Sequence, residues 1–172
     1  LPLQCEKSWR QTLDDTAALR PDRIALYNFA FLPTKLAHQR KLEEQEMPAP
    51  EFKLQMFIEA HDRLTREGYV FIGMDHYALA DDPLAKALEE GTLRRNFMGY
   101  TTLRGVDMLA FGTSSISDLN GAYAQNTKKL SIYNRLVSQA VLPVERGLLL
   151  SDDDLVRRHI IEEIMCNGIL RF

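Results

Sequence analysis

The sequence predicts an α/β protein, because helix-like and strand-like segments alternate along the chain. The helix-like residues 6–19 are followed by the apolar run 22–31, and the helix-like residues 51–67 by the apolar run 69–78. Such alternation is typical of parallel β/α units. The composition, with 45% hydrophobic and 26% charged residues over 172 positions, is that of a globular protein.

Apolar spacing and chain-terminating residues predict the helices of the first half. Trp9 and Leu13 lie on one side of the first helical segment. Gly68 ends the segment in which apolar residues recur every three or four positions. Pro83 suits the first turn of a short helix. The helices expected in this half are residues 6–19, 35–46, 51–67 and 83–90.

Three apolar runs predict strands. DRIALYNFAF and YVFIGMDHYA are apolar on both faces and suit buried strands. VDMLAFGTSSIS, residues 106–117, predicts a strand that runs into a turn rich in Gly, Ser and Thr. The stretch RNFMGYTT, residues 95–102, matches neither helical spacing nor strict alternation, and we expect a loop there.

The last third of the chain predicts two helices. Residues 127–139 carry apolar side chains spaced for one helical face. Ser151 is a good N-cap for a second helix, which should continue to Cys166 and end at Gly168.

Charge and composition exclude several functions. A net charge of −3 gives no electrostatic footprint for nucleic acid. No apolar run approaches the ~20 residues of a membrane span, so the cytoplasm is the expected location. Cys5 and Cys166 lie at opposite ends of the sequence, without the spacing of a zinc site or disulfide framework, and no metal site is predicted. The chain opens with LPLQ rather than Met, and we expect a piece of a longer protein.

Three segments that follow predicted strands are candidate sites: NFAFLPT, GMDHYA and FGTSSIS. Asp75 and His76 are interpreted as a hydrogen-bonding pair, with acid/base or metal chemistry as the alternative, because adjacent strand residues point to opposite faces. FGTSSIS offers backbone amides to a phosphate or nucleoside but lacks the glycine spacing of a P-loop. Ser114 and Ser115 lack the G-x-S-x-G turn of a nucleophilic serine.

Taken in order, several blocks of the sequence resemble one known family. YNFAFLPTKLAHQRK, GYVFIGMDHYA, RRNFMGYTT, AFGTSSIS, AQN and RRHIIEEIMCN are similar in order and spacing to the oxygen-independent coproporphyrinogen III oxidases. These are radical S-adenosylmethionine (SAM) enzymes of haem biosynthesis. The resemblance implies part of a TIM-like radical-SAM barrel, made of carboxyl-side β/α units, in residues 1–125. The start of a mostly helical C-terminal domain is implied for residues 126–172.

The resemblance also implies an activity and its cofactors. Enzymes of this family oxidatively decarboxylate two propionate groups of coproporphyrinogen III, which leaves the vinyl groups of protoporphyrinogen IX. A [4Fe–4S] cluster reduces SAM to a 5′-deoxyadenosyl radical, which abstracts a hydrogen from the propionate side chain. The cofactors therefore carry the difficult chemistry, and the protein positions and shields them.

One motif of the family is missing from the chain. Its cluster is held by CxxxCxxC, which Cys5 and Cys166 cannot supply. We therefore expect this chain to be the carboxyl-side part of an enzyme whose N-terminal half lies elsewhere in the same protein. The isolated chain should bind no cluster and be inactive, and its unpaired barrel edges favour self-association.

Four residues match functional positions of the family. Ala30 and Ile116 match positions that line SAM, and Phe97 matches an aromatic residue at the active site. Met98 stands where relatives carry glutamine; its thioether can pack but donates no hydrogen bond. Phe97 and Met98 are predicted to wall a dry active-site pocket for coproporphyrinogen III.

Some alternatives stay open at this point. Arg94 and Arg95 are candidates for pairing with substrate carboxylates, and ordinary surface arginines are the alternative. A haem-binding chaperone relative would share the barrel but lack the ending Met165, Cys166 and Asn167. A non-catalytic α/β binding module is also compatible with composition and fold class alone.

Overall fold

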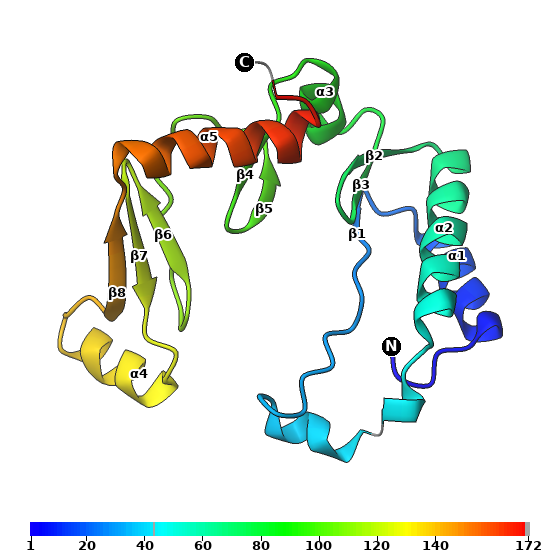
Figure 1. Ribbon diagram of the computed structural model, residues 1–172, viewed down its shortest axis with the longest axis horizontal. Helices are drawn as coiled ribbons and strands as arrows, with labels where there is room; N and C mark the ends of the chain where they lie inside the picture. The colour runs from blue at the N-terminus through cyan, green and yellow to red at the C-terminus, as the bar shows by residue number, and fades with distance from the viewer. Residues whose placement is uncertain (43, 171–172) are drawn as a thin grey trace. The chain divides into compact units, whose positions relative to one another are not determined.

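The computed structural model describes residues 1–42 and 44–170 (Figure 1). They form two compact units: unit 1 is Leu1–Glu90, and unit 2 begins at Gly91. Unit 1 contains α1 (Glu6–Leu19), β1 (Arg23–Ala25), the 3-10 helices η1 (Ala37–Lys41) and η2 (Glu44–Glu46), α2 (Pro50–Arg66), β2 (Tyr69–Gly73), β3 (His76–Leu79) and α3 (Pro83–Glu89). Unit 2 contains β4 (Arg94–Asn96), β5 (Gly99–Thr101), β6 (Ile116–Leu119), β7 (Ala122–Asn126), α4 (Leu130–Ser138), β8 (Val144–Leu149) and α5 (Asp152–Asn167).

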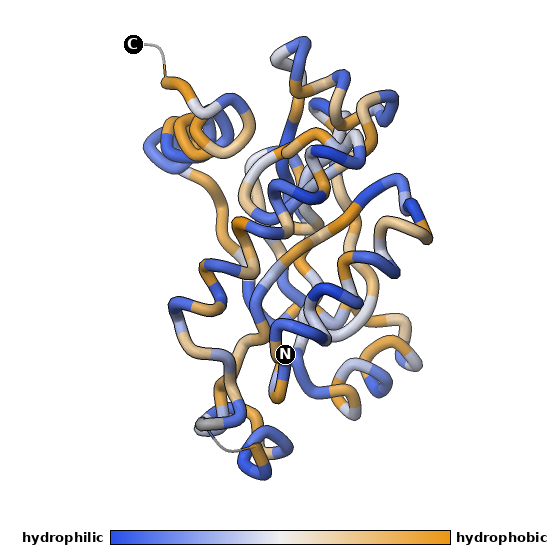
Figure 2. The backbone as a smooth tube through the Cα atoms, turned by 90° about the vertical axis from the view of Figure 1, so that its right-hand side faces the viewer, coloured by the Kyte–Doolittle hydropathy of each residue, from blue (hydrophilic) through white to orange (hydrophobic). Residues whose placement is uncertain are grey.

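The helices α1 and α2 form an apolar layer of unit 1, and both were correctly predicted. Trp9 and Leu13 of α1 cluster with Met56 and Ala60 of α2, and all four side chains are buried. Figure 2 shows apolar and polar residues interleaved along the helices. This spacing lets each helix bury one side while the other side stays in water.

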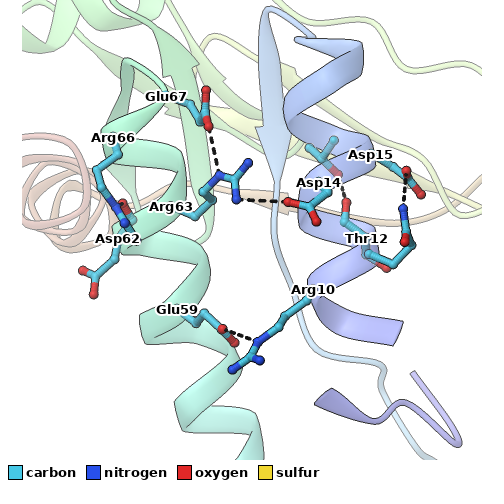
Figure 3. Close-up of polar contacts among 11 residues, drawn as sticks. Arg10, Thr12, Asp14, Asp15, Glu59, Asp62, Arg63, Arg66 and Glu67 are labelled. Atoms are coloured by element: carbon cyan, nitrogen blue, oxygen red, sulfur yellow. Dashed lines mark hydrogen bonds and ion pairs between the residues drawn. The ribbon is translucent and has the colours of Figure 1, made fainter. Parts of the chain in front are cut away.

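Ion pairs join the solvent-facing sides of the same two helices (Figure 3). Arg10 Nε lies 3.2 Å from Glu59 Oε1. Arg63 of α2 lies 3.0 Å from Asp14 of α1, and it also pairs at 2.9 Å with Glu67 at the end of its own helix. Exposed pairs of this kind add little to stability, because water and salt screen them. Burial of the apolar sides therefore holds α1 against α2.

The sheet of unit 1 is antiparallel, which corrects the expected parallel β/α arrangement. Its strand order is β1-β3-β2, and both strand pairs run antiparallel. The apolar run 69–78 is a hairpin rather than one strand, because the chain reverses around Gly73 and Met74, whose φ angles are 146° and 51°. No Asn-Gly or Asp-Gly pair marks this turn, so the pattern of apolar residues alone did not reveal it.

Two other expectations for unit 1 were wrong. The predicted buried strand at 22–31 is reduced to the three residues of β1, and Tyr27 is 75% exposed. β1 pairs with β3, and within the described residues the remainder of the run has no strand partner. The predicted helix at 35–46 is replaced by η1 and η2, and residue 43 of that prediction lies outside the described residues.

The predicted helix after Asp81 is present as α3. Asp82 caps it, because its Oδ1 accepts a hydrogen bond from Leu84 N at 2.7 Å. Its other oxygen pairs with Arg23 Nε at 2.8 Å. Burial raises the pKa of Asp82, but the hydrogen bonds from Arg23 and Leu84 and the charges of Arg23 and Lys86 together outweigh that effect and leave the pKa below its usual value.

The RNFMGYTT stretch is a β-hairpin and not the expected loop. β4 and β5 pair antiparallel, with Asn96 opposite Gly99, so Phe97 and Met98 form a two-residue turn. Asn96 Oδ1 accepts a hydrogen bond from Met98 N at 2.8 Å, and Gly99 has a φ of 124°. Large apolar residues therefore occupy a position where turns usually carry small polar ones.

The sheet of unit 2 has the order β6-β7-β8 and is also antiparallel. The strand predicted over 106–117 begins only at β6; before it, Met108 forms a single bridge to Asp118. Neither β7 nor β8 was predicted. The signal for the first hairpin is Asn120-Gly121, with φ angles of 26° and 92°, a dipeptide that favours a two-residue hairpin turn.

The two helices of unit 2 differ in how closely they follow the prediction. Ser151 caps α5 by accepting a hydrogen bond from Asp154 N at 3.3 Å, and Gly168 ends it in the left-handed conformation. α4 is shorter than the predicted 127–139 and has no buried residue. Tyr100 OH donates to Met165 O at 3.0 Å and links the hairpin to α5.

The described chain is a mixed α/β protein with small antiparallel sheets, which confirms the predicted class. Its compact units divide between Glu90 and Gly91. The domain boundary expected at 125/126 stays a prediction. No helix in the described part of the chain is long and apolar enough to cross a membrane.

Candidate ligand-binding site in the second unit

Unit 2 contains a cavity of about 390 Å³ that is lined from three elements. The β4–β5 hairpin contributes Arg95 and Phe97. The sheet contributes Tyr123 and Leu148, and α5 contributes Ile161 among others. Apolar walls with a few polar groups are typical of small-molecule sites.

An ion pair forms one wall of this cavity. Arg158 donates two hydrogen bonds to Asp118, at 3.0 and 2.8 Å. Burial lowers the pKa of Arg158, but the hydrogen bonds to Asp118 together with the charges of Tyr123, Asp118 and Glu162 outweigh this and raise it, so the guanidinium stays charged. A bidentate arginine–carboxylate pair fixes the orientation of both side chains. Arg158 is thereby occupied by the protein itself.

Aromatic rings continue the same wall. The guanidinium of Arg158 lies 5.7 Å from the ring centre of Tyr123. Phe97 meets Tyr123 edge-on, with ring centres 4.9 Å apart. Burial raises the pKa of Tyr123, so its hydroxyl stays neutral. Phe97, Tyr123 and Arg158 thus form one continuous surface of contacting groups.

A second, more polar cavity of about 290 Å³ adjoins the first, since both are lined by Arg95, Asp118, Arg158 and Glu162. Arg94 also lines it, with Nε 3.8 Å from Glu162 Oε1. The surroundings of Arg95 and Arg158 therefore change from apolar on one side to polar on the other.

The structure places the two predicted active-site residues differently. Phe97 lines the first cavity and is 52% exposed. Met98, next to it in the turn, is 85% exposed and does not line either of the two cavities. Of the predicted pair, only Phe97 contributes to a wall within unit 2.

The two residues predicted to contact SAM lie in separate units. Ala30 is exposed in the irregular segment after β1, and its carbonyl accepts a hydrogen bond from Gln39 Nε2 at 2.9 Å. Ile116 is half-buried at the start of β6, opposite Gln125. It does not line the cavity that contains Phe97.

Asn126 is a buried residue that holds the segment before Ile116, and sequence reasoning missed this role. Its side chain, 7% exposed, donates hydrogen bonds to Ala110 O at 3.3 Å and Gly112 O at 3.0 Å. Its backbone N–H donates to Ser115 O at 2.9 Å. Asn126 thereby sets the path of the segment that leads to Ile116. The AQN block contained the signal, but nothing local in it indicates what the amide binds.

The predicted pairing of Asp75 with His76 is present. His76 Nδ1 lies 2.6 Å from Asp75 Oδ1. Asp75 lies in the turn of the β2–β3 hairpin rather than within a strand, so the two adjacent side chains can meet.

The cysteines do not fit an iron–sulfur cluster, which takes thiolate ligands. Burial raises the pKa of Cys166 to about 11, so its thiol stays protonated. Cys5 is exposed and belongs to unit 1. Over residues 1–42 and 44–170, no group of three His, Cys, Asp or Glu side chains is arranged to hold a metal ion.

Comparison with solved structures first defines the class of protein. The coproporphyrinogen III oxidase of Escherichia coli, described as a radical SAM enzyme, matches with a TM-score of 0.92 and 45% sequence identity. The match covers 97% of this chain and 38% of that one. The fold is therefore that of part of a radical SAM enzyme.

Curated relatives then give the particular proteins to which the chain is similar. Oxygen-independent coproporphyrinogen III oxidases are 48% identical over 96% of this chain in Synechocystis sp. and 41% identical over 100% of it in Pseudomonas aeruginosa. No protein-family model matches the chain. The chain is thus homologous over nearly its whole length to one part of the oxygen-independent coproporphyrinogen III oxidases, and the resemblance seen in its sequence is confirmed.

The chain spans only 36% and 37% of the length of these two relatives. This coverage agrees with the expected partial chain.

Proposed function

We propose that this chain is part of an oxygen-independent coproporphyrinogen III oxidase. The complete enzyme would convert coproporphyrinogen III to protoporphyrinogen IX by radical SAM oxidative decarboxylation, as an oxidoreductase of porphyrin and haem biosynthesis in the cytoplasm. The observation that carries this proposal is the end-to-end similarity, 41% to 48% identical, to relatives of that name, together with the TM-score of 0.92.

The cavity of unit 2 supports this proposal in its chemistry. Its walls combine aromatic and aliphatic side chains with guanidinium groups. A porphyrinogen presents apolar pyrrole rings with carboxylates at its rim, so the two sets of groups are complementary. The substrate is accordingly proposed to contact unit 2.

Four residues retain their proposed roles in the complete enzyme. Ala30 and Ile116 would contact SAM, and Phe97 and Met98 would border the reacting part of the substrate. The role of Phe97 is supported by its place in the cavity wall. When bound, SAM and the [4Fe–4S] cluster supply the radical chemistry; the cluster ligands would come from the N-terminal half of the protein.

The proposal is tested with the complete gene product, assayed anaerobically with coproporphyrinogen III and product analysis by chromatography. Phe97→Ala and Ile116→Glu should abolish protoporphyrinogen IX formation while the absorbance of the cluster is retained. Leu130→Glu, at a 64% exposed position of α4, is the matched control and should remain active. Wild-type turnover in Phe97→Ala and Ile116→Glu would refute the site assignment.

The isolated chain gives a second test. After anaerobic reconstitution it should show no iron–sulfur absorbance and no turnover, and adding the N-terminal half should restore both. A stoichiometric, cysteine-dependent cluster on these residues alone would contradict the proposal.

Two other functions predict different results. A haem-binding chaperone would bind haem and leave coproporphyrinogen III unchanged. A non-catalytic binding module would bind no haem and would also leave coproporphyrinogen III unchanged. The relatives reported above all carry the name of the oxidase, which favours the enzyme.

A further inference from the structure

We propose that Arg95 binds a carboxylate of the substrate and that the neighbouring cavity holds the apolar ring carrying that carboxylate. The inference rests on the proposed function, because it takes the ligand to be a propionate-bearing pyrrole. It goes further by assigning the anion-binding group within unit 2.

Arg95 is distinguished from other arginines of the cavity by its contacts. Arg158 is bound by Asp118 through two hydrogen bonds, and Arg157 lies 2.6 Å from Asp153. In the part of the chain that the structure describes, Arg95 forms no ion pair. Its guanidinium lies 5.6 Å from the ring centre of Tyr100. A guanidinium with no carboxylate partner can accept one from a ligand.

The hairpin positions this guanidinium on a firm support. Arg95 lies directly opposite Tyr100 in the β4–β5 pair, so both side chains are on the same face. Tyr100 is 8% exposed and its hydroxyl donates to Met165 O at 3.0 Å. Tyr100 therefore holds the surface over which Arg95 lies.

The acidic residues of the first cavity have partners of their own. Asp118 is neutralised by Arg158. Asp154 accepts hydrogen bonds from Ser151 N and Oγ, at 2.9 and 2.7 Å. Glu162 has the Arg94 guanidinium 3.8 Å away. Among the residues that the structure describes, the cation that remains at this wall without an ion-pair partner is Arg95.

The rest of the cavity suits the uncharged part of such a ligand. Phe97 and Tyr123 present ring surfaces, and Leu148, Ile161 and Met165 add aliphatic ones. A volume of about 390 Å³ lies within the range of small-molecule sites. It would take one pyrrole with its propionate, whose carboxylate would lie at Arg95.

The test measures binding as well as turnover in the complete, cluster-containing enzyme. Coproporphyrin III, the stable oxidised form of the substrate, serves as a fluorescent probe for Kd. Arg95→Gln should raise Kd for coproporphyrin III and KM for coproporphyrinogen III by about 10- to 100-fold, because a charge-assisted hydrogen bond is lost. Arg95→Lys should recover part of this loss, since it keeps the charge but not the planar fork.

The matched control is Arg135→Gln, at an exposed arginine of α4 that lines neither cavity. It removes the same charge from unit 2 and should leave Kd and KM unchanged. If the wild-type enzyme turns over normally but the Kd of Arg95→Gln lies within twofold of that of Arg135→Gln, the assignment of Arg95 is wrong. The proposed function would then still stand. Absence of wild-type turnover would instead overturn the proposed function.

Discussion

The two compact units are held together in different ways. In unit 1, apolar side chains from α1, α2 and the first sheet fill two clusters, and Tyr77 and Leu64 are almost inaccessible to water. In the described part of unit 2, buried apolar residues are few: Leu93, Tyr100, Pro143 and Cys166. Its buried polar residues are Asp118, Asn126 and Thr127.

This difference shows how each unit obtains a defined structure. Apolar burial in unit 1 is non-directional and stabilises roughly in proportion to the area removed from water. The buried polar groups of unit 2 act through hydrogen bonds of fixed geometry, which fix particular loops and side chains. The unit that contains the proposed substrate cavity is therefore the one with the more polar interior.

The largest expected effect is in the apolar core of unit 1. Leu64→Ala should lower the free energy of unfolding by about 2–5 kcal/mol, because it leaves a cavity where the native side chain is 2% exposed. Urea denaturation measures the change. Leu54→Ala on the same helix, at a 61% exposed position, should change it by less than about 0.5 kcal/mol. Equal effects at both positions would contradict the packing described for α2.

The ion pair of unit 2 should give the next largest effect. Asp118→Ala should lower the free energy of unfolding by about 1–3 kcal/mol. This is less than the loss expected for breaking a fully buried pair, because the Arg158 side chain is 42% exposed. Hydrogen exchange should accelerate in β6 and β7. The fully solvated pair of Arg157 with Asp153 supplies the control: Asp153→Ala should leave exchange in the sheet unaltered. Faster exchange confined to unit 1 would contradict the prediction.

Removing the buried side-chain amide of Asn126 should lower the stability somewhat less than Asp118→Ala does. Asn126→Ala removes the donor to Ala110 O and Gly112 O, at a cost of about 1–2 kcal/mol. Amide exchange should rise in residues 110–116. Asn134→Ala, at an exposed position of α4, should have no such effect. An unchanged exchange rate around Gly112 in Asn126→Ala would show that the amide does not hold this segment.

The smallest effect concerns the buried thiol of unit 2. The pKa of Cys166 is raised from 9.0 to about 11 by burial, so the unfolded chain loses this proton first. The contribution of Cys166 to stability should be complete below about pH 9 and decline as the pH rises towards 11. The free energy of unfolding of wild type relative to Cys166→Ala, measured by denaturation, should therefore be smaller at pH 10 than at pH 8. A difference independent of pH would contradict a buried neutral thiol.

Alkylation with iodoacetamide checks the same contrast between units. Cys5 is exposed, and hydrogen bonds from Ser8 lower its pKa, so it should react well before Cys166. In Cys5→Ser, the remaining thiol should react only slowly at pH 8. Rapid labelling of that variant would show that Cys166 is accessible.

Local sequence signals predicted the helices that end in recognisable caps. Pro21 and Gly68 follow α1 and α2, Asp82 starts α3, and Ser151 and Gly168 bound α5. Each of these residues acts on its own backbone or on a neighbour within one helical turn, so the information is local. The family resemblance was equally readable, because it depends on the order of blocks and not on the fold.

The strands were predicted poorly for the opposite reason. An apolar run such as 69–78 shows that the segment is buried, but whether it is one strand or a hairpin depends on which strand pairs with it. β8 is exposed at all six residues, and its apolar residues Val144, Leu148 and Leu149 do not alternate as in a half-buried strand; it is defined by its hydrogen bonds to β7. Pairing partners are distant in sequence, so local periodicity does not specify them.

The sequence by itself determined the boundaries of the capped helices, the α/β class and the family resemblance, because each depends on residues close together or on the order of motifs. Only the tertiary structure decided that Arg158 is bound by Asp118, 40 positions away, while Arg95 has no carboxylate partner in the described chain. The physical reason is that folding decides which carboxylates come within hydrogen-bonding distance of each guanidinium, and so which charge stays available to a ligand. In the sequence, Arg95 and Arg158 look alike.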